Sequence, residues 1–566
     1  MEQWLEIRKS GRFDEIGKKY GIDPVVARIM RNRDVTEDGE IESYLNGTTA
    51  SMGNPWLLKD AKEGAELLQE KIQEKKKIRI IGDYDIDGVM STYILLQAIR
   101  ELGGVVDVEI PDRIKDGYGV NEQLVEQAVA DGVDTILTCD NGIAAKKELE
   151  AAKDAGLTVI ITDHHEIPYQ EEEQERIYLI PKVDAVIDPK QEECTYPYKG
   201  ICGAVVAWKL IQVLYETMGR DRQEADKFLE YAAFATVGDV MELRGENRIL
   251  VKEGLKRLNQ TENMGLKALI FRNQLQNREI KAYHIGFVLG PCLNASGRLD
   301  TARKALKLLC AENWQEAVSL AEDLTGLNEI RKDMTQKGVE EAVNQIEQSP
   351  WKQDKVYVVY LPECHESIAG IIAGRIREKY HRPVFVLTKA AEGVKGSGRS
   401  IEAYSMYEEL CKCQELLDKF GGHPMAAGLS MQEEHIEEFR QMLNRNSVLE
   451  DGDIEPVIRF DAVLQLKDWT EERVLQLEKL EPFGNGNEKP IFAAKNLRAQ
   501  HIRQVGKEGQ MQKMILMDKD GTKCEAISFE NHNISEGEEF RILYYPQINS
   551  YGGYETIQLV ISGICR

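Results

Sequence analysis

Three aspartates stand two residues apart in the stretch IIGDYDIDG, which covers residues 80–88 of the 566-residue chain. Asp83, Asp85 and Asp87 follow a short apolar run and precede a glycine. Carboxylates at this spacing repel one another, and a bound cation removes that repulsion. Carboxylate oxygens are the ligands that hard divalent cations prefer in proteins. The spacing therefore predicts a metal site in this stretch.

Other acidic and histidine side chains also follow apolar runs. Asp140 stands in LTCDNG, Asp163, His164 and His165 stand in IITDHHE, and Asp239 stands in FATVGDV. Each motif is weak evidence alone, but the carboxyl ends of parallel strands meet at one edge of a sheet. Carboxylates gathered there can hold two cations about 3.5 to 4 Å apart and promote in-line phosphoryl displacement. Together the motifs predict a two-metal centre.

The elements that must position these motifs alternate between strand and helix from residue 78 to about residue 240. Apolar runs such as IRIIG and LTVIIT alternate with helical stretches such as NEQLVEQAVADG. This pattern is typical of an α/β fold with a doubly wound, mainly parallel sheet. The predicted strands are 78–82, 105–110, 134–138, 157–162 and 185–188, and the predicted helices are 89–103, 121–132 and 143–156.

Two further folding units are predicted downstream. Residues 313–347 are charged and helical in pattern, so we expect one long helix that bridges two lobes. A second, smaller α/β unit follows, and alternating runs after PFGNGNEKP predict a small antiparallel β-barrel or sandwich. In the smaller α/β unit we expect strands at 356–361 and 383–388, a helix at 366–380, and glycine-rich loops at 393–400 and 419–428.

Composition limits the class of protein. No apolar run of 18 residues and no basic-then-apolar leader is present, so we expect no membrane span, no secretory signal and a cytoplasmic location. The ten cysteines lack the spacing of a zinc site and are expected to be reduced thiols. The net charge of −24 argues against nucleic acid, although a local basic groove can exist on an acidic protein.

The metal motifs resemble those of the DHH phosphoesterases, a family named after the sequence found at residues 163–165. Further stretches narrow the resemblance to the RecJ-type single-stranded-DNA-specific exonucleases, over the chain from about residue 50 to its end. These stretches are PDRIKDGYGV at 111–120, ICGAVVAWKL at 201–210, GENR at 245–248, LGPCLNASGRLD at 289–300, HESIAGIIAGR at 365–375, KGSGRSI at 395–401, FGGHPMAAGLS at 420–430 and EPFGNGN at 481–487.

The resemblance implies a domain order and an activity. An N-terminal extension at 1–50 precedes a DHH catalytic domain at 51–312, a bridging helix at 313–348, a DHHA1-like substrate-binding domain at 349–450 and an OB-like domain at 451–566. The implied activity is 5′ to 3′ hydrolysis of single-stranded DNA with two Mn²⁺ or Mg²⁺ ions, releasing 5′-mononucleotides in DNA recombination and repair. A monomer is expected, with single-stranded DNA, a single-strand-binding protein and a helicase as partners.

The same resemblance assigns roles to the motif residues. Asp140 is the implied bridge between the metals, while Asp83 is either a ligand or a hydrogen-bond acceptor beside the ligands. His165 would contact the scissile phosphate, and Asp163 would orient the histidines. Many family members have a histidine where this chain has Ile81. The implied ligands are Asp83, Asp85, Asp87, Asp140, His164 and Asp239.

A second set of residues is expected to bind the substrate. Guanidinium groups suit phosphate because they present a planar, permanently charged fork. The resemblance implies that Arg113, Ser397 and Arg399 hold the 5′ end; the alternatives are internal ion pairs for the arginines and a turn position for His423. Cys292 stands where the family usually has arginine. The full expected set is Arg113, Asn294, Ser296, Arg298, Ser397, Arg399 and His423.

Four tyrosines near the C-terminus are candidates for stacking on bases, but tyrosines in strands also simply pack. They are Tyr544, Tyr545, Tyr551 and Tyr554.

Two other activities are alternatives to the exonuclease. The first is a related phosphatase of oligoribonucleotides or nucleotides, although the added barrel counts against it. A catalytically silent DNA-binding scaffold is the other alternative, against which the retained metal-motif acids argue.

Overall fold

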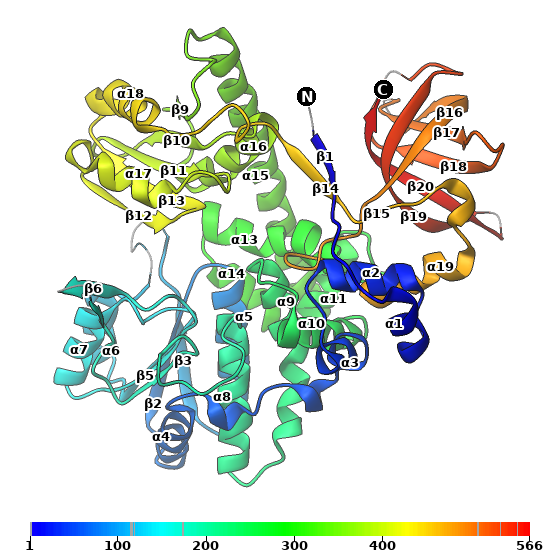
Figure 1. Ribbon diagram of the computed structural model, residues 1–566. Coiled ribbons are helices and arrows are strands. Elements are labelled where there is room, and N and C mark those ends of the chain that lie inside the picture. Colours follow the sequence, from blue (N-terminus) through cyan, green and yellow to red (C-terminus); the bar gives the residue numbers. More distant parts are fainter. Residues whose placement is uncertain are drawn as a thin grey trace. The chain divides into compact units, whose positions relative to one another are not determined.

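A computed structural model describes residues 3–113, 117, 119–172, 175–506, 509–532, 534–551 and 553–566. The chain divides into two compact units (Figure 1). The larger unit comprises Leu5–Asn294, Ala302–Ala321 and Arg459–Arg566, and the smaller unit comprises Met1–Trp4, Ala295–Thr301 and Glu322–Ile458. No helix within the described ranges is long and apolar enough to cross a membrane.

A five-stranded sheet in the larger unit carries the metal motifs. Its order is β3-β2-β4-β5-β8, and all neighbouring strands are parallel. The chain passes from β2 to β3 at one edge and returns to β4 on the other side of β2, so the winding reverses between β2 and β4. Open α/β sheets bind ligands at such a point. The strands are β2 (Lys77–Gly82), β3 (Val105–Glu109), β4 (Thr135–Cys139), β5 (Thr158–Thr162) and β8 (Ala185–Ile187), which confirms the five predicted strands.

Helices cover both faces of this sheet, which confirms the doubly wound prediction (Figure 1). Apolar residues of α6 and α7 share a hydrophobic cluster with Ile81, Ile136 and Ile161 of the strands. Helices α4, α5 and α8 lie on the other face. Because both faces are buried, the strands have continuous apolar sequences. The bounds are α4 (Ala61–Gln73), α5 (Ile86–Glu101), α6 (Glu122–Ala130), α7 (Lys146–Asp154) and α8 (Gly203–Thr217).

Further helices follow the sheet in the larger unit. One of them is a π-helix, a rare form that often marks functional sites. A two-stranded antiparallel hairpin, β6 (Tyr169–Glu172) and β7 (Glu175–Tyr178), precedes β8. The helices are α9 (Leu229–Gly238), α10 (Gly245–Leu258), α11 (Met264–Arg272), α12 (Ala282–His284), the π-helix η4 (Ile285–Leu289), α13 (Gly290–Leu299) and α14 (Arg303–Leu309).

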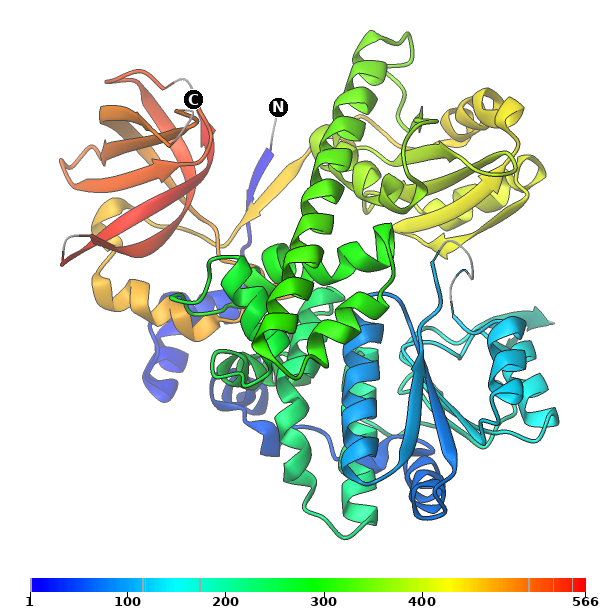
Figure 2. The same ribbon diagram turned by 180° about the vertical axis from the view of Figure 1, so that it is seen from behind.

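The C-terminal strands form a closed barrel, as expected for an OB-like fold (Figure 2). Pairing between β16 and β19 closes the sheet, and the short β15 (Ala462–Val463) extends it beside β16. Strand β16 was not predicted from the sequence. Its alternation is broken by two register shifts, where Asn496 and His501 have positive φ. The barrel strands are β16 (Phe492–Val505), β17 (Met511–Met517), β18 (Lys523–Ser528), β19 (Glu539–Tyr551) and β20 (Tyr554–Cys565).

The N-terminal helices share a hydrophobic core with the barrel. Val26 and Ile29 belong to the same buried cluster as Leu477, Phe492 and Leu516. The N-terminal segment is therefore packed onto the C-terminal part of the chain, more than 400 residues away in sequence. These elements are α1 (Phe13–Tyr20), α2 (Pro24–Asn32), α3 (Asp38–Asn46) and, before the barrel, α19 (Glu471–Gln476). The pair β1 (Gln3–Glu6) and β14 (Val457–Phe460) forms a separate two-stranded sheet.

The smaller unit contains a five-stranded mixed sheet with the order β12-β13-β11-β10-β9. The expectation of glycine-rich loops at 393–400 and 419–428 is wrong, because these residues form strands β11, β12 and β13. A Cβ at Gly396 would lie 2.4 Å from Leu387, so glycine lets these strands pack closely. The bounds are β9 (Tyr357–Tyr360), β10 (Val384–Lys389), β11 (Val394–Arg399), β12 (Lys419–His423), β13 (Ala426–Met431), α16 (Ala369–Tyr380), α17 (Met406–Lys412) and α18 (Ile436–Asn446).

One long helix, α15 (Trp314–Gln348), begins in the larger unit and ends in the smaller unit (Figure 2). It confirms the uninterrupted helix predicted at 313–347. Its C-terminal part packs into the core of the smaller unit, where Ala342 and Ile346 are fully buried beside Ile372 of α16.

Candidate metal centre and DNA-binding residues

The first group of ligand atoms belongs to Asp83, Asp85 and Asp140, and these atoms lie within 4.8 Å of one another. The first two residues follow β2 and the third follows β4, the two strands on either side of the switch point. Asp85 Oδ1 also accepts the backbone N–H groups of Asp87 at 2.9 Å and Gly88 at 3.1 Å, which caps α5. The carboxylate of Asp85 therefore caps the N-terminus of α5 and also belongs to the first group of ligand atoms.

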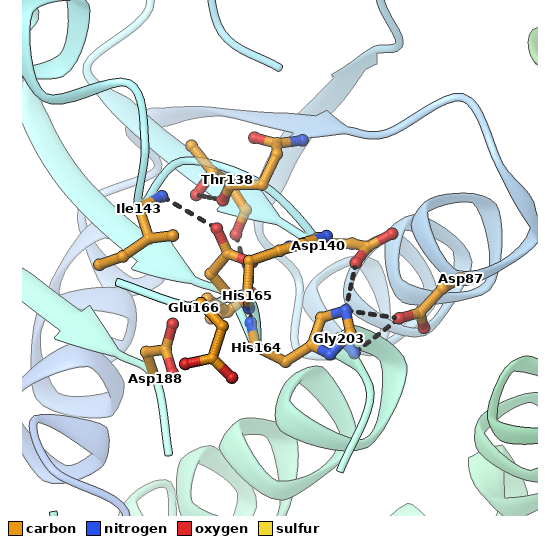
Figure 3. A network of polar contacts seen from close by, with 12 residues as sticks. Asp87, Thr138, Asp140, Ile143, His164, His165, Glu166, Asp188 and Gly203 are labelled. Carbon is orange, nitrogen blue, oxygen red and sulfur yellow. Dashed lines mark hydrogen bonds and ion pairs between the residues drawn. The ribbon is translucent and has the colours of Figure 1, made fainter. Parts of the chain in front are cut away.

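The second group consists of Asp87, His164 and Asp239. His164 Nε2 lies 3.5 Å from Asp87 Oδ2 and 3.1 Å from Asp140 Oδ1 (Figure 3). It lies 3.9 Å from Asp239 Oδ2. Asp140 thus belongs to the first group and contacts the second. The loops after β2, β4 and β5 supply these residues, and Asp239 caps the C-terminal end of α9. The three strands are adjacent in the sheet but not consecutive in the chain, because β3 lies at the edge.

Backbone groups hold Asp87 and Asp140 in place. The N–H groups of Gly203 and Ala204, at the start of α8, donate to the two oxygens of Asp87 at 2.7 and 2.8 Å. A helix N-terminus stabilises a nearby negative charge. Asp140 has a φ of +59°, in the sparsely populated left-handed region, where strain is often tied to function.

Asp163 orients both histidines of the DHH motif. Its Oδ1 accepts the His164 N–H at 2.7 Å and lies 2.7 Å from His165 Nδ1, while its Oδ2 accepts the Ile143 N–H at 2.9 Å. Burial alone raises the pKa of Asp163, but these hydrogen bonds and the charges of the histidines outweigh it and lower the pKa. Nδ1 of His165 therefore faces Asp163, and Nε2 lies on the opposite side of the ring.

The electrostatics of the centre fit divalent cations. Burial, followed by repulsion from neighbouring carboxylates, raises the pKa values of Asp83, Asp85 and Asp140, and raises that of Asp239 to about 8. Asp83 Oδ1 is buried and has no hydrogen-bond partner among the described residues. A bound cation would provide the partner that this buried carboxylate oxygen lacks, and carboxylates with one imidazole suit Mn²⁺ or Mg²⁺.

Arg113 and Asn294 lie next to the acidic loop. The Arg113 guanidinium lies 5.1 Å from the centroid of the Tyr84 ring, within the DYDID sequence. Asn294 Oδ1 accepts the Ile86 N–H at 2.8 Å, so this residue holds the loop that carries the acids. The rest of the 111–120 motif lies partly outside the described residues, at 114–116 and 118.

In the smaller unit, the sheet places three expected substrate residues together. Arg399 of β11 pairs with Ala426 of β13, and Ala426 pairs with His423 of β12. Arg399 and His423 therefore lie on either side of the small residue Ala426. Ser397, two residues before Arg399, is on the same face and pairs with a glycine. Arg399 Nη1 donates to the Gly398 carbonyl at 2.7 Å. His423 is an exposed strand residue, and not the turn residue of the alternative prediction.

The two expected residues of α13 in the smaller unit are less accessible. Ser296 is fully buried, and Arg298 is half-buried and donates to the Ser367 carbonyl at 2.8 Å. Arg298 therefore has an internal partner, as in the alternative prediction, but the partner is a backbone carbonyl and not an acidic side chain.

The barrel tyrosines differ in how far they are exposed to solvent. Tyr544 is fully buried and its hydroxyl bonds Trp469 Nε1 and the Leu464 carbonyl, so the stacking prediction for it is wrong and the packing alternative holds. Tyr545 is half-buried, Tyr554 is 80% exposed, and the side chain of residue 551 lies outside what the structure describes.

Three family models match parts of this chain. The DHH family N-terminal domain matches residues 77–238, the DHHA1 domain matches 353–447, and the RecJ OB domain matches 460–563. The single-stranded-DNA-specific exonuclease RecJ of Escherichia coli is 32% identical, with 100% of both chains covered. The chain belongs to the RecJ family.

Other RecJ proteins support this membership. RecJ of Bacillus subtilis is 35% identical over 548 residues, which cover 95% of this chain and 68% of that protein. A crystal structure of RecJ in complex with Mn²⁺ from Thermus thermophilus covers 100% of this chain and 79% of its own, with a TM-score of 0.83 and 26% identity. The complex of that protein with Mg²⁺ has a TM-score of 0.77.

The structure accounts for both departures from the family pattern. Ile81 is fully buried in the hydrophobic cluster under α6 and α7, and Asp83 contributes the third ligand atom of the first group. Cys292 is also fully buried, and its thiol lies 3.2 Å from the Val288 carbonyl. Both positions are therefore parts of the core in this chain.

Sequence reasoning missed Asp188, which follows β8 directly. Its Oδ2 is buried without a hydrogen-bond partner among the described residues, and Asp188 is one of the residues drawn in Figure 3. Burial, together with the charge of Asp163, raises its pKa to about 8. The signal was available, because Asp188 is the last residue of the predicted strand AVID and the other acids also stand at or after the ends of apolar runs.

Proposed function

We propose that this chain is a metal-dependent exonuclease that degrades single-stranded DNA in the 5′ to 3′ direction and releases 5′-mononucleotides. Its proposed place is DNA recombination and repair. The observation that carries the proposal is the pair of ligand groups in contact through Asp140, at the switch point of the sheet. Membership of a family of single-stranded-DNA-specific exonucleases supplies the substrate.

The proposed site holds two Mn²⁺ or Mg²⁺ ions. Asp83, Asp85 and Asp140 would hold one ion, and Asp87, Asp140, His164 and Asp239 would hold the other. Two such ions, when bound, lower the pKa of a bound water and neutralise charge on a phosphate undergoing in-line displacement. Asp140, between the groups, would be shared by both.

In this proposal His165 contacts the phosphate and Asp163 positions His165, and neither residue binds metal. Asp163 fixes the ring orientation of His165 through Nδ1. Nε2 of His165 would contact an oxygen of the scissile phosphate and stabilise the charge that develops there. The positioning of a histidine by a buried carboxylate is a recurring arrangement at phosphoryl and metal sites.

The direction of degradation requires a site for the 5′ end. We assign this role to Arg113, Ser397 and Arg399. In the sheet of the smaller unit, His423 and Arg399 pair with the same residue, Ala426. Asn294 supports the acidic loop, and Arg298 supports the segment around Ser367. Guanidinium groups and a hydroxyl provide the charged and directional donors that a terminal phosphate needs.

The proposed domain limits follow from these roles of the residues. Residues 51–312 form the catalytic domain after an extension at 1–50, 313–348 the bridging helix, 349–450 the substrate-binding domain and 451–566 the OB-like domain. We further propose that the protein acts as a monomer in the cytoplasm, where a single-strand-binding protein and a helicase supply its substrate.

The test is a nuclease time course with Mn²⁺ on single-stranded DNA labelled in turn at each end. Blunt duplex DNA, a short RNA dinucleotide and an EDTA control accompany it. We expect metal-dependent release of mononucleotides from the 5′ end of the single strand. Preference for the dinucleotide would instead indicate a small-substrate phosphatase, and binding without cleavage would indicate a silent scaffold.

A further inference from the structure

Tyr84 stands between Asp83 and Asp85, two residues of the first group of ligand atoms. It is half-buried, whereas Asp83 is fully buried. The loop on its C-terminal side is fixed, because Asp85 caps α5 and Asn294 Oδ1 accepts the Ile86 N–H at 2.8 Å. The Tyr84 side chain is therefore carried on a fixed backbone next to the metal centre.

The ring of Tyr84 contacts Arg113. The central carbon of the guanidinium lies 5.1 Å from the ring centroid, within the roughly 6 Å over which an aromatic face attracts a cation. Both residues belong to the larger unit, Tyr84 in the loop after β2 and Arg113 in the segment after the neighbouring strand β3. The contact therefore joins the loop of the metal ligands to the segment that follows the edge strand.

The surroundings of Arg113 are acidic. Burial and the charge of Asp85 raise the pKa of Asp83, while the charges of His165 and Arg113 lower it by less. The Arg113 guanidinium is therefore close enough to Asp83 for the two charges to interact. An arginine and a carboxylate readily form a bidentate ion pair, which here would occupy the donors of Arg113 and an oxygen proposed to bind metal.

A contact with a ring face avoids this competition. A guanidinium stacks on an aromatic face through its own flat face, whereas it donates hydrogen bonds in its own plane. One guanidinium can therefore contact a tyrosine ring and a phosphate oxygen at the same time. The attraction arises from the quadrupole of the ring, so it holds the arginine without neutralising its charge.

We propose that Tyr84 is a positioning residue that holds the Arg113 guanidinium beside the metal centre and directs its N–H groups to a phosphate of the bound DNA. This inference rests on the proposed role of Arg113 in binding the 5′ end. Tyr84 acts through Arg113 and makes no contact with the DNA in this arrangement. Loss of the ring should therefore weaken DNA binding only while Arg113 is present.

The test compares steady-state kinetics on a 5′-phosphorylated oligodeoxythymidylate at saturating Mn²⁺. Tyr84→Leu keeps apolar bulk but removes the ring, and it should raise KM about 3- to 30-fold with little change in kcat, the range that a cation–π contact supports. Tyr84→Phe keeps the ring and should have a KM within about twofold of that of the unchanged protein.

A double-mutant cycle shows whether Tyr84 acts through Arg113. Arg113→Ala and Tyr84→Leu/Arg113→Ala should have the same KM, because the double variant has no guanidinium left to position. If the two increases in KM multiply, Tyr84 acts on the DNA or on the loop by itself, and the proposal is overturned. The Kd for Mn²⁺, measured by calorimetry, should also be equal in these two variants, and a weaker Kd in the double variant would assign the effect to the loop.

Tyr169→Leu is the matched control. The central carbon of the Arg176 guanidinium lies 4.5 Å from the Tyr169 ring centroid, in the hairpin of β6 and β7, so the same substitution removes a similar contact elsewhere in the larger unit. Its KM should equal that of the unchanged protein. An equal rise of KM in Tyr169→Leu and Tyr84→Leu would overturn the proposal, because the effect would not be specific to Tyr84.

The outcomes separate this proposal from the proposed function. If Arg113→Ala raises KM and Tyr84→Leu does not, the positioning role is overturned and the exonuclease proposal stands. If Arg113→Ala leaves KM unchanged, the positioning role fails together with the 5′-end role of Arg113, while cleavage by the unchanged protein still supports the exonuclease. If the protein cleaves no DNA, the exonuclease proposal fails, and the same variants are compared by the Kd of the oligonucleotide in EDTA. An equal Kd for Tyr84→Leu and the unchanged protein would then overturn the positioning role.

Discussion

Gly203, the first residue of α8, donates its backbone N–H to Oδ2 of Asp87 at 2.7 Å. The position has no room for a side chain, because an added Cβ would lie 2.8 Å from Cβ of Asp140 and 2.9 Å from its Oδ1. Glycine therefore brings the positive end of a helix against two carboxylates of the metal centre at once.

Gly203→Ala should weaken metal binding because its methyl group must displace Asp140. We expect the Kd for Mn²⁺, measured by calorimetry, to rise about 10- to 100-fold, as when residues that support metal ligands are changed. Gly200→Ala is the control, since its Cβ would make only ordinary contacts at 3.6 Å with Tyr198. An unchanged Kd in Gly203→Ala would show that the close approach is not needed for metal binding.

Asp140→Asn should abolish cleavage and leave DNA binding largely intact. Asparagine tolerates the positive φ of this position, so the backbone is preserved while the shared charge is lost. We expect cleavage of single-stranded DNA to fall by about 10³-fold or more, since several kcal/mol of charge stabilisation are removed. Asp140→Ala should give the same loss, and exposed Asp154→Asn serves as control. Near-normal turnover in the Asp140 variants would contradict the assignment of this residue as the bridge.

The parallel sheet and its acids could be predicted because burial on both faces leaves continuous apolar runs in the sequence. Each run ends where a polar residue is needed, and the topology brings those ends together. The same reasoning applies to Asp188, which was missed because it stands alone at the end of its strand. Asp239 was predicted from its motif, but it follows a helix, so its place is set by the packing of α9 and not by a strand end.

The smaller unit and β16 show where the sequence signal fails. Gly396 and Gly398 lie inside β11, where glycine relieves crowding by Leu387, Phe385 and neighbouring side chains, yet glycine in sequence usually indicates a loop. In β16, two bulges shift the alternation of buried and exposed residues, so the strand does not have a constant period of two. In both cases the local sequence does not indicate a strand, and tertiary packing determines that the segment forms one.

Arg399→Ala should reduce the preference for a 5′ phosphate. Loss of a charged hydrogen-bonding group to a phosphate is expected to raise KM for 5′-phosphorylated single-stranded DNA about 10- to 100-fold. The ratio of kcat/KM for 5′-phosphorylated and 5′-hydroxyl strands is the measurement, and Arg399→Lys should restore it only in part. Arg375→Ala, at an exposed position of α16, is the control. A ratio that stays the same in Arg399→Ala would remove this residue from the 5′-end site.

Asp188→Asn should flatten the dependence of stability on pH. Burial raises the pKa of Asp188 to about 8, above the value of about 3.9 in an unfolded chain. Its contribution to stability is therefore complete below about pH 4 and is lost as the pH rises toward 8. Between pH 5 and pH 8 in EDTA, the fall in Tm should be smaller for Asp188→Asn than for the unchanged protein. The exposed Asp154→Asn variant should keep the original slope, and an equal slope in Asp188→Asn would mean that this carboxyl is already ionised.

Arg248 joins the catalytic part of the larger unit to both ends of the chain. Its buried guanidinium donates to the carbonyls of Tyr44, Leu480 and Lys479 at 3.1, 2.9 and 2.9 Å, and lies 3.7 Å from the centroid of the Tyr44 ring. These carbonyls stand near the C-terminal ends of α3 and of the short helix Leu477–Leu480, where a cation is favourable.

Arg248→Met keeps the length and apolar packing of this side chain but removes the donor to the carbonyls of Tyr44 and Lys479. The Leu480 carbonyl still accepts from Asn487 Nδ2 at 2.8 Å and from the Tyr44 hydroxyl at 3.2 Å. We expect the free energy of unfolding, measured in urea, to fall by at least about 2 kcal/mol, from about 1 kcal/mol or more for each carbonyl that loses its donor. Arg257→Met, at an exposed position of the same helix, should change it by less than about 0.5 kcal/mol. Equal stability of the two variants would show that solvent or neighbouring groups replace the guanidinium, and that the N-terminal helices and barrel are held by their shared hydrophobic core alone.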